Sequence, residues 1–218
     1  VEFWSQPSAT SFVDLVNLCE TKLLDMEKAA GAPITLIDHS FGGQLARALS
    51  ERQSKKINQL IFLNSAFSPF ECFMNLGRHL KMVNYDRLES LRAATVDDKI
   101  KFILEISTQP HFSELYWQSE TKFADFSNTA MQFASLNPEV FVQIFSDFLT
   151  NKANSSNLPS SFDGKVHIFS SAFDRLLSAH DTQMWGQVYP RAKFISLDTG
   201  GHYVLFEDPL LPKRIFNF

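Results

Sequence analysis

The feature that most constrains the fold is a buried strand, a helix and a second buried strand in direct succession. Residues 33–37 (PITLI) form a short apolar run without alternation, which is typical of a strand buried on both faces. Residues 41–52 have the pattern of a helix, and Ile57–Leu63 (INQLIFL) repeats the strand pattern. This succession predicts an α/β fold with a mostly parallel sheet.

The strand pattern stops after Asn64 and is replaced by a long stretch of amphipathic helical patterns. It resumes at Val166–Ser170 and again at Lys193–Leu197. A helical block therefore interrupts an α/β core that continues on both sides. We expect a first part of the core at residues 1–65, a helical cap inserted at 66–160, and a second part of the core at 161–218.

The segment IDHSFGG (residues 37–43) joins the first strand to the helix that follows it. A serine on so sharp a turn needs small neighbours, because its backbone is strained and the helix packs closely on the strand; Gly42, Gly43 and Ala46 meet this need. The turn also directs the Phe41 amide, at the positive end of the helix, towards an oxyanion on a substrate. Ser40 is therefore a candidate nucleophile. The alternative is an ordinary strand-to-helix turn with a capping serine.

A nucleophilic serine needs a base, and the base needs an orienting acid. His202 follows the last strand in the glycine-containing loop TGGHY, and Asp174 lies in the loop after the strand Val166–Ser170. The 28 positions from Asp174 to His202 leave room for one helix and one strand. The chain order Ser40, Asp174, His202 is the order expected for a serine hydrolase built on a parallel sheet.

These motifs give the chain a resemblance to a known family. The segments DHSFGGQLA, SSAFDRLLS and DTGGHYVLFEDP resemble those of α/β-hydrolases that carry a helical cap, of the esterase, C–C hydrolase and lyase kind. The resemblance covers the sheet parts of Pro33–Leu63 and Lys165–Phe218. It implies that Ser40 is the nucleophile, Asp174 the acid, His202 the base and Phe41 the donor of one oxyanion-hole amide.

The chain departs from the family at Asp38, where most members have glycine two residues before the nucleophile. A carboxylate there must find hydrogen bonds or distort the turn. Asp38 is also a rival to Asp174 as the acid, although a side chain at this place on the strand should face the interior beneath Ser40.

A second departure concerns the strands and the His-Gly loop that precede this region in the family, for which we find no counterpart. The strand Ile34–Ile37 then lacks a neighbour on one side, which leaves a hydrophobic edge open. Either the chain is a fragment or it is a catalytically silent member. We expect a missing N-terminal segment or a second chain to lie against this strand and to supply the second oxyanion amide.

The composition limits which kinds of binding partner we expect for this chain. The net charge of −4 gives no basic surface for nucleic acid, and no apolar run is long enough to span a membrane. The histidines show no paired metal-ligand spacing, so we expect neither metal nor cofactor. With two cysteines and no recognisable secretory signal, we expect a cytoplasmic protein.

The 22 phenylalanines bear on the substrate. One interpretation is that a small helical cap needs large side chains to build its own core. The other is that some of them line an apolar acyl pocket above Ser40, with Phe67 and Phe70 nearest after Phe41.

The function that these observations favour is hydrolysis of a carboxylic ester with a small or medium apolar acyl group, through an acyl-enzyme, as in carboxylesterases. The alternatives are a C–C bond hydrolase or lyase that uses the same triad, and a silent member that only binds a ligand.

Overall fold

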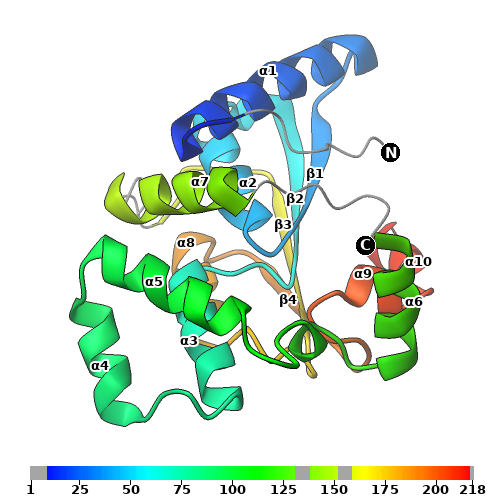
Figure 1. The fold of residues 1–218 in the computed structure, drawn as a ribbon. Coiled ribbons are helices and arrows are strands. Elements are labelled where there is room, and N and C mark those ends of the chain that lie inside the picture. Colours follow the sequence, from blue (N-terminus) through cyan, green and yellow to red (C-terminus); the bar gives the residue numbers. More distant parts are fainter. Residues whose placement is uncertain (1–8, 131–137, 152–158, 217–218) are drawn as a thin grey trace.

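The computed structural model describes residues 9–130, 138–151 and 159–216. In chain order, the elements are α1 (Phe12–Ala30), β1 (Ile34–His39), α2 (Gly42–Arg52), η1 (Ser54–Lys56), β2 (Ile57–Leu63), α3 (Pro69–His79), α4 (Tyr85–Ala93), α5 (Val96–Ser107), η2 (Ser113–Tyr116), α6 (Glu120–Ala130), α7 (Pro138–Asn151), β3 (Lys165–Ser171), α8 (Ala179–Val188), β4 (Lys193–Leu197), α9 (Val204–Glu207) and α10 (Leu211–Phe216). Figure 1 shows their arrangement.

The four strands form one parallel sheet in the order β1-β2-β3-β4, as the strand and helix pattern predicts. In this register Asp38 of β1 lies beside Phe62 of β2, which in turn lies beside Ile168 of β3. Because the strands are parallel, their carboxyl ends meet at one edge of the sheet. The loops that follow all four strands therefore converge there.

Side chains alternate between the two faces of the sheet. On one face, Leu60 and Phe62 belong to a core that also contains residues of α1, α2 and α8. On the other face, Ile61 and Leu63 pack with residues of α9 and α10. Both faces of β2 are thus buried, which explains its continuous apolar sequence.

The prediction that the first strand is buried on both faces is wrong. Ile34 and Leu36 pack against the core beneath α1 and α2, whereas Thr35 is exposed and Ile37 is 39% exposed. The reason is the position of β1 at the edge of the described sheet, where β2 is its only partner strand. The second chain or further segment expected at this edge stays a prediction.

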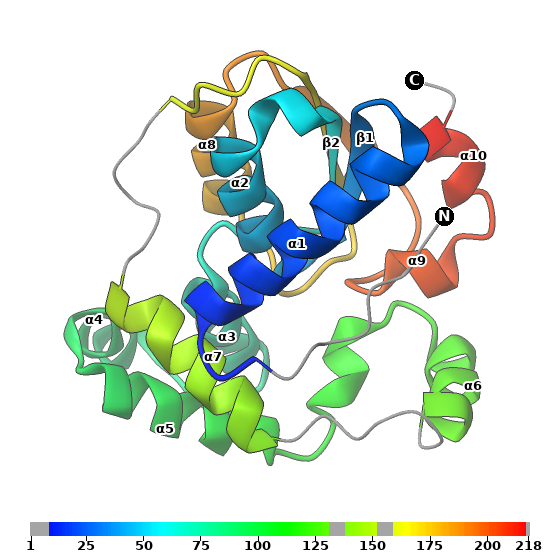
Figure 2. The same cartoon turned by 90° about the horizontal axis from the view of Figure 1, so that it is seen from above.

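The helices α3 to α7 all lie between β2 and β3, within the range expected for an inserted cap. They build a core of their own, to which Phe70, Met74 and Phe102 belong. The helix α7 also packs against α1, as Figures 1 and 2 show from two directions. There the Phe12 N–H donates a hydrogen bond of 2.9 Å to Asp147. The block is therefore joined to the α/β core through α7.

Candidate active site

Ser40 lies on a strained turn between β1 and α2. Its φ of 56° falls in the left-handed region, which few residues other than glycine adopt. The turn is held on both sides, because the Ser40 N–H donates to the Leu63 carbonyl at 3.3 Å and the Ser40 carbonyl accepts from the Ala66 N–H at 3.2 Å. Such a turn exposes the hydroxyl at the end of the sheet, as the nucleophile elbow requires.

Glycine is required at position 43 because α2 packs very closely behind this turn. A Cβ atom on Gly43 would lie 2.7 Å from Cβ of Ser65 and 3.2 Å from the Trp185 ring. Position 41 is different, because the Phe41 ring packs on Phe148 with the ring centroids 5.3 Å apart. The Phe41 backbone is thereby fixed at the start of α2.

The three residues predicted as a triad lie in hydrogen-bond contact. Nε2 of His202 is 2.8 Å from Oγ of Ser40, and Nδ1 of His202 is 2.8 Å from Oδ2 of Asp174. Only 1% of each of the His202 and Asp174 side chains is exposed. With the proton on Nδ1 donated to the carboxylate, Nε2 is free to accept the serine proton. The arrangement suits general-base activation of a hydroxyl.

Asp174 is held in place by its own loop. Its Oδ1 accepts hydrogen bonds from the backbone N–H groups of Leu176 at 2.8 Å and Leu177 at 3.3 Å. Oδ2 is left for His202. Each carboxylate oxygen therefore has a partner, which fixes the orientation of the imidazole.

Sequence reasoning missed Asn64, which lies directly after β2 and is fully buried. Its Nδ2 donates to the carbonyls of Gly201 at 2.9 Å and His202 at 3.0 Å, and its Oδ1 accepts from the Ser171 N–H at 2.7 Å. Asn64 thus ties the loop that carries His202 to the ends of β2 and β3. Its φ of 43° lies in the left-handed region, which asparagine tolerates better than most residues. The signal that the sequence offered was an asparagine directly after a predicted strand.

His39 also holds the His202 backbone. Its Nε2 lies 2.8 Å from the His202 carbonyl, so this nitrogen carries a proton and donates it. Burial, with the charge of His202 as a second cause, lowers the pKa of His39 to about 4. His39 is therefore neutral at neutral pH.

The helical block reaches the same loop from the other side. The Gly200 N–H donates to Oε1 of Gln118 at 2.5 Å. The carboxylate of Glu207 accepts from the N–H groups of Gln118 and Ser119 at 2.8 and 2.7 Å, and from that of Gly201 at 2.5 Å. The loop between η2 and α6 is in this way fastened to the loop that carries His202.

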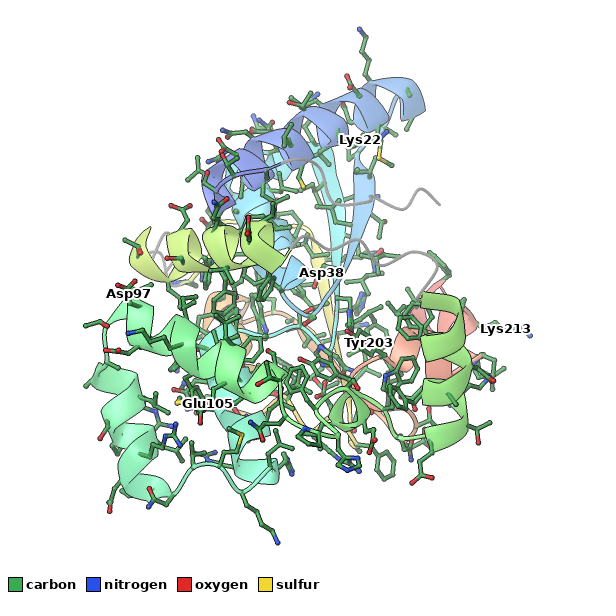
Figure 3. The ribbon with its side chains drawn as sticks, viewed as in Figure 1. Lys22, Asp38, Asp97, Glu105, Tyr203 and Lys213 are labelled. Atoms are coloured by element: carbon green, nitrogen blue, oxygen red, sulfur yellow. The ribbon has the colours of Figure 1, made fainter. Side chains whose placement is uncertain are left out.

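Asp38 lies beneath the turn and does not contact His202 in the way that Asp174 does. Its side chain is buried, and Oδ1 accepts a hydrogen bond from the Ser65 hydroxyl. Oδ2 has no hydrogen-bond partner among the described residues. Burial raises the pKa of Asp38 well above its ordinary value, although the Ser65 bond opposes this. Figure 3 shows Asp38 inside the molecule, whereas Lys22 and Lys213 lie at its surface.

The raised pKa of Asp38 predicts a pH-dependent stability. Above a pH of about 4, the unfolded chain releases this proton while the folded chain retains it, so folding becomes less favourable as pH rises. Asp38→Asn should remove this loss. We measure the free energy of unfolding in urea for Asp38→Asn and for the parent. The variant's value minus the parent's should be larger at about pH 8 than at about pH 4. Asp25→Asn, at an exposed site on α1, is the control. An equal difference at both pH values would contradict the expectation.

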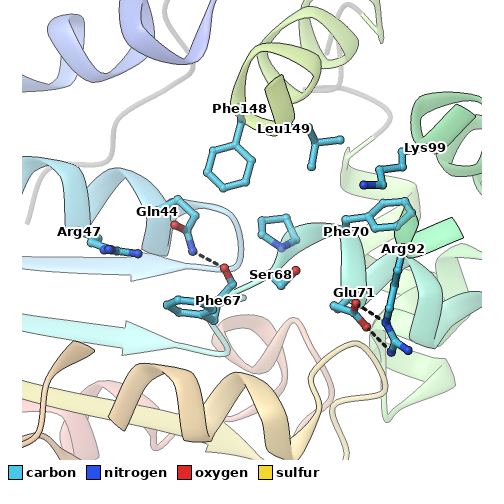
Figure 4. Close-up of a pocket in the computed structure, with 11 residues that line it drawn as sticks. Gln44, Arg47, Phe67, Ser68, Phe70, Glu71, Arg92, Lys99, Phe148 and Leu149 are labelled. Atoms are coloured by element: carbon cyan, nitrogen blue, oxygen red, sulfur yellow. Dashed lines mark hydrogen bonds and ion pairs between the residues drawn. The ribbon is translucent and has the colours of Figure 1, made fainter. Parts of the chain in front are cut away.

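Phe67 and Phe70 line a cavity of about 450 Å³ that lies between α2, α7 and the start of α3 (Figure 4). The residues around this cavity do not include Ser40, Asp174 or His202. That the two phenylalanines contact an acyl group on Ser40 stays a prediction.

The described residues contain no group of three His, Cys, Asp or Glu side chains placed to hold a metal ion. None of the described helices combines the length and apolar character needed to cross a membrane.

Solved structures of several enzymes resemble this chain. A thermophilic esterase from Thermogutta terrifontis is 16% identical with a TM-score of 0.62, and the match covers 100% of this chain and 74% of that one. The 2-hydroxy-6-oxo-6-phenylhexa-2,4-dienoate hydrolase of Rhodococcus sp. strain RHA1 is 11% identical with a TM-score of 0.63, covering 97% and 73%. A hydrolase from Oleispira antarctica is 20% identical with a TM-score of 0.58, covering 99% and 76%. At these identities the likeness shows the fold alone.

Comparison of the sequence with models of protein families identifies the family of this chain. No curated protein matches the sequence. The family model for the alpha/beta hydrolase fold matches residues 5–209, which is most of the chain. The match agrees with the parallel sheet and with the strained turn after β1. The chain belongs to the α/β-hydrolase fold family.

Proposed function

We propose that the protein is a serine hydrolase that cleaves a carboxylic ester with a small or medium apolar acyl group. The observation that carries this proposal is the continuous hydrogen-bonded line from Ser40 through His202 to Asp174, with both contacts at 2.8 Å. The strained turn at Ser40 and the burial of both partners support it.

The reaction would proceed in two halves. His202 takes the proton of Ser40 as the hydroxyl oxygen attacks the ester carbonyl, and the Phe41 N–H donates to the oxyanion that forms. His202 then gives the proton to the leaving alcohol, and an acyl group remains on Ser40. Water, deprotonated by His202, cleaves this acyl-enzyme and releases the carboxylic acid. Asp174 keeps the imidazole in the required tautomer throughout.

A second oxyanion donor is part of the proposal. We place it on a further segment of polypeptide, from a longer form of this chain or from a second chain, that pairs with the edge of β1 for which the described residues provide no partner strand. The exposure of Ile37 on this edge strand supports such a partner. Loss of one donor typically costs a factor of about 10²–10³ in kcat, so turnover by residues 1–218 alone should be slow but measurable.

We also propose that residues 66–160 act as a cap over the triad. The contacts of Tyr116 support this role, because its ring centroid lies 5.5 Å from that of His202 and its carbonyl accepts from the Tyr203 N–H at 3.2 Å. Location in the cytoplasm remains an expectation from composition.

A substrate panel tests the reaction class. We expect release of p-nitrophenol from its acetate and butyrate esters above the uncatalysed rate, followed by absorbance. Ser40→Ala should abolish the release, and Ser90→Ala, at an exposed serine of α4, should leave it unchanged. Cleavage of vinylogous diketones without ester turnover would replace the proposal with C–C bond hydrolysis. No turnover of either class would favour a silent ligand-binding protein.

A further inference from the structure

The cavity that Phe67 and Phe70 line has a mostly apolar and well-fixed wall. Besides these two rings, it contains Phe148 and Leu149 of α7. The loop that carries Phe67 is held from two sides. The Phe67 carbonyl accepts a hydrogen bond from Nε2 of Gln44 at 2.8 Å, and the Phe67 N–H donates to Oδ1 of Asp181 at 3.0 Å. The cavity is thus a built feature of the junction between α2 and the helical block.

A charged side chain is buried at one end of this cavity. Arg47 of α2 is only 2% exposed. Its Nε contacts Glu51 at 3.2 Å, but its Nη2 has no hydrogen-bond partner among the described residues. Buried guanidinium donors are almost always paired, because an unpaired one loses its hydration without compensation. Figure 4 shows the guanidinium beside Gln44 and Phe67, at the opposite end from Lys99.

The charges around the cavity favour an anion. Its wall holds three cationic side chains, Arg47, Arg92 and Lys99, and one carboxylate, that of Glu71. Glu71 is already engaged by Arg92 through two hydrogen bonds of 2.9 and 3.0 Å. The Lys99 ammonium lies 5.4 Å from the centroid of the Phe70 ring. Glu71 therefore offsets the charge of Arg92, and Glu51 offsets that of Arg47. Among the described residues, Lys99 is the cation of the wall that pairs with no carboxylate.

We propose that this cavity is a second ligand site that binds an apolar carboxylate, with the carboxylate on Arg47 and the hydrocarbon part between Phe67, Phe148 and Leu149. A carboxylate matches the planar donor geometry of a guanidinium, and the aromatic wall suits an aliphatic or aromatic body. The site is separate from the triad, since none of the three triad residues lines it.

The test is calorimetric titration of octanoate into the Ser40→Ala protein, in which no hydrolysis by Ser40 can take place. We expect saturable binding that weakens at least about tenfold in Ser40→Ala/Arg47→Gln, because a hydrogen bond to a charged group is lost. The matched control is Arg52→Gln. Arg52 lies on the same helix but is exposed, pairs with Glu20 and does not line the cavity. Octanamide, which has the same chain without the charge, should bind about tenfold more weakly than octanoate.

A second variant shows whether a loss of binding comes from the cavity itself or from misfolding of the Arg47 variant. Leu149→Trp should fill the cavity without changing its charge and should abolish octanoate binding. Equal binding of octanoate and octanamide, full binding to either the Arg47 or the Leu149 variant, or no octanoate binding at all would each overturn the proposal. Tight binding of inorganic phosphate in place of octanoate would instead identify a small-anion site. Because all proteins carry Ser40→Ala, these outcomes are independent of the proposed hydrolysis.

Discussion

Asp174→Asn is expected to lower kcat for a p-nitrophenyl ester by about 10⁴-fold while the protein stays folded. The asparagine keeps the size of the side chain, but its NH₂ group can face Nδ1 of His202 and favour the wrong imidazole tautomer. Nε2 would then carry the proton and could not accept one from Ser40. Steady-state kinetics would measure the loss, and circular dichroism would show that the fold is kept.

The control for this variant is Asp198→Asn. Asp198 is exposed and pairs with Arg214 at the surface, so its replacement should leave kcat within about twofold of the parent. A loss of less than about tenfold for Asp174→Asn would mean that Asp174 does not orient the base.

Asn64→Ala is expected to lower the free energy of unfolding by about 3 kcal/mol, measured by urea denaturation. The substitution removes three buried hydrogen bonds. The Gly201 carbonyl and the Ser171 N–H lose the partner that Asn64 provides, whereas the His202 carbonyl keeps its bond from His39. Alanine is also less tolerant than asparagine of the positive φ at this position. Because the His202 backbone loses an anchor, kcat should fall as well.

Two further variants test whether the loss of stability comes from the hydrogen bonds of Asn64. Asn58→Ala, at an exposed residue of β2, should change stability by less than about 1 kcal/mol. Asn64→Asp keeps the acceptor for Ser171 but loses both donors, so it should also be destabilising. If Asn64→Ala were as stable as the parent, the three contacts would not hold the loop that carries His202.

The proximity of the three candidate triad residues could be predicted from the sequence because a parallel sheet places the ends of all its strands at one edge. Ser40, Asp174 and His202 each follow a strand, so their proximity comes from the topology rather than from their distance along the chain. The turn at Ser40 was recognisable for a similar reason. Its strained backbone and the tightly packed α2 require a small residue at the position that Gly43 occupies, whereas a Cβ atom on Gly42 would make only an ordinary contact with Asp38.

The contacts that hold the triad could not be predicted in this way. Gln118 and Glu207 meet at the loop that carries His202 only because the helical block folds back over the sheet, which no local pattern specifies. The exposure of Ile37 was missed because burial depends on what covers a strand and not on its composition alone. The unpaired Nη2 of Arg47 likewise becomes visible only in three dimensions.

The central claim is that Ser40 is an activated nucleophile. Its most direct test is to label the intact protein with a fluorophosphonate probe and to measure the mass of the labelled protein by mass spectrometry. The probe reacts with a serine whose hydroxyl is deprotonated by a neighbouring base, and it needs no knowledge of the natural substrate. We predict a single adduct that maps to Ser40 and is absent from Ser40→Ala. No adduct on the parent protein, or an adduct that persists in Ser40→Ala, would contradict the claim.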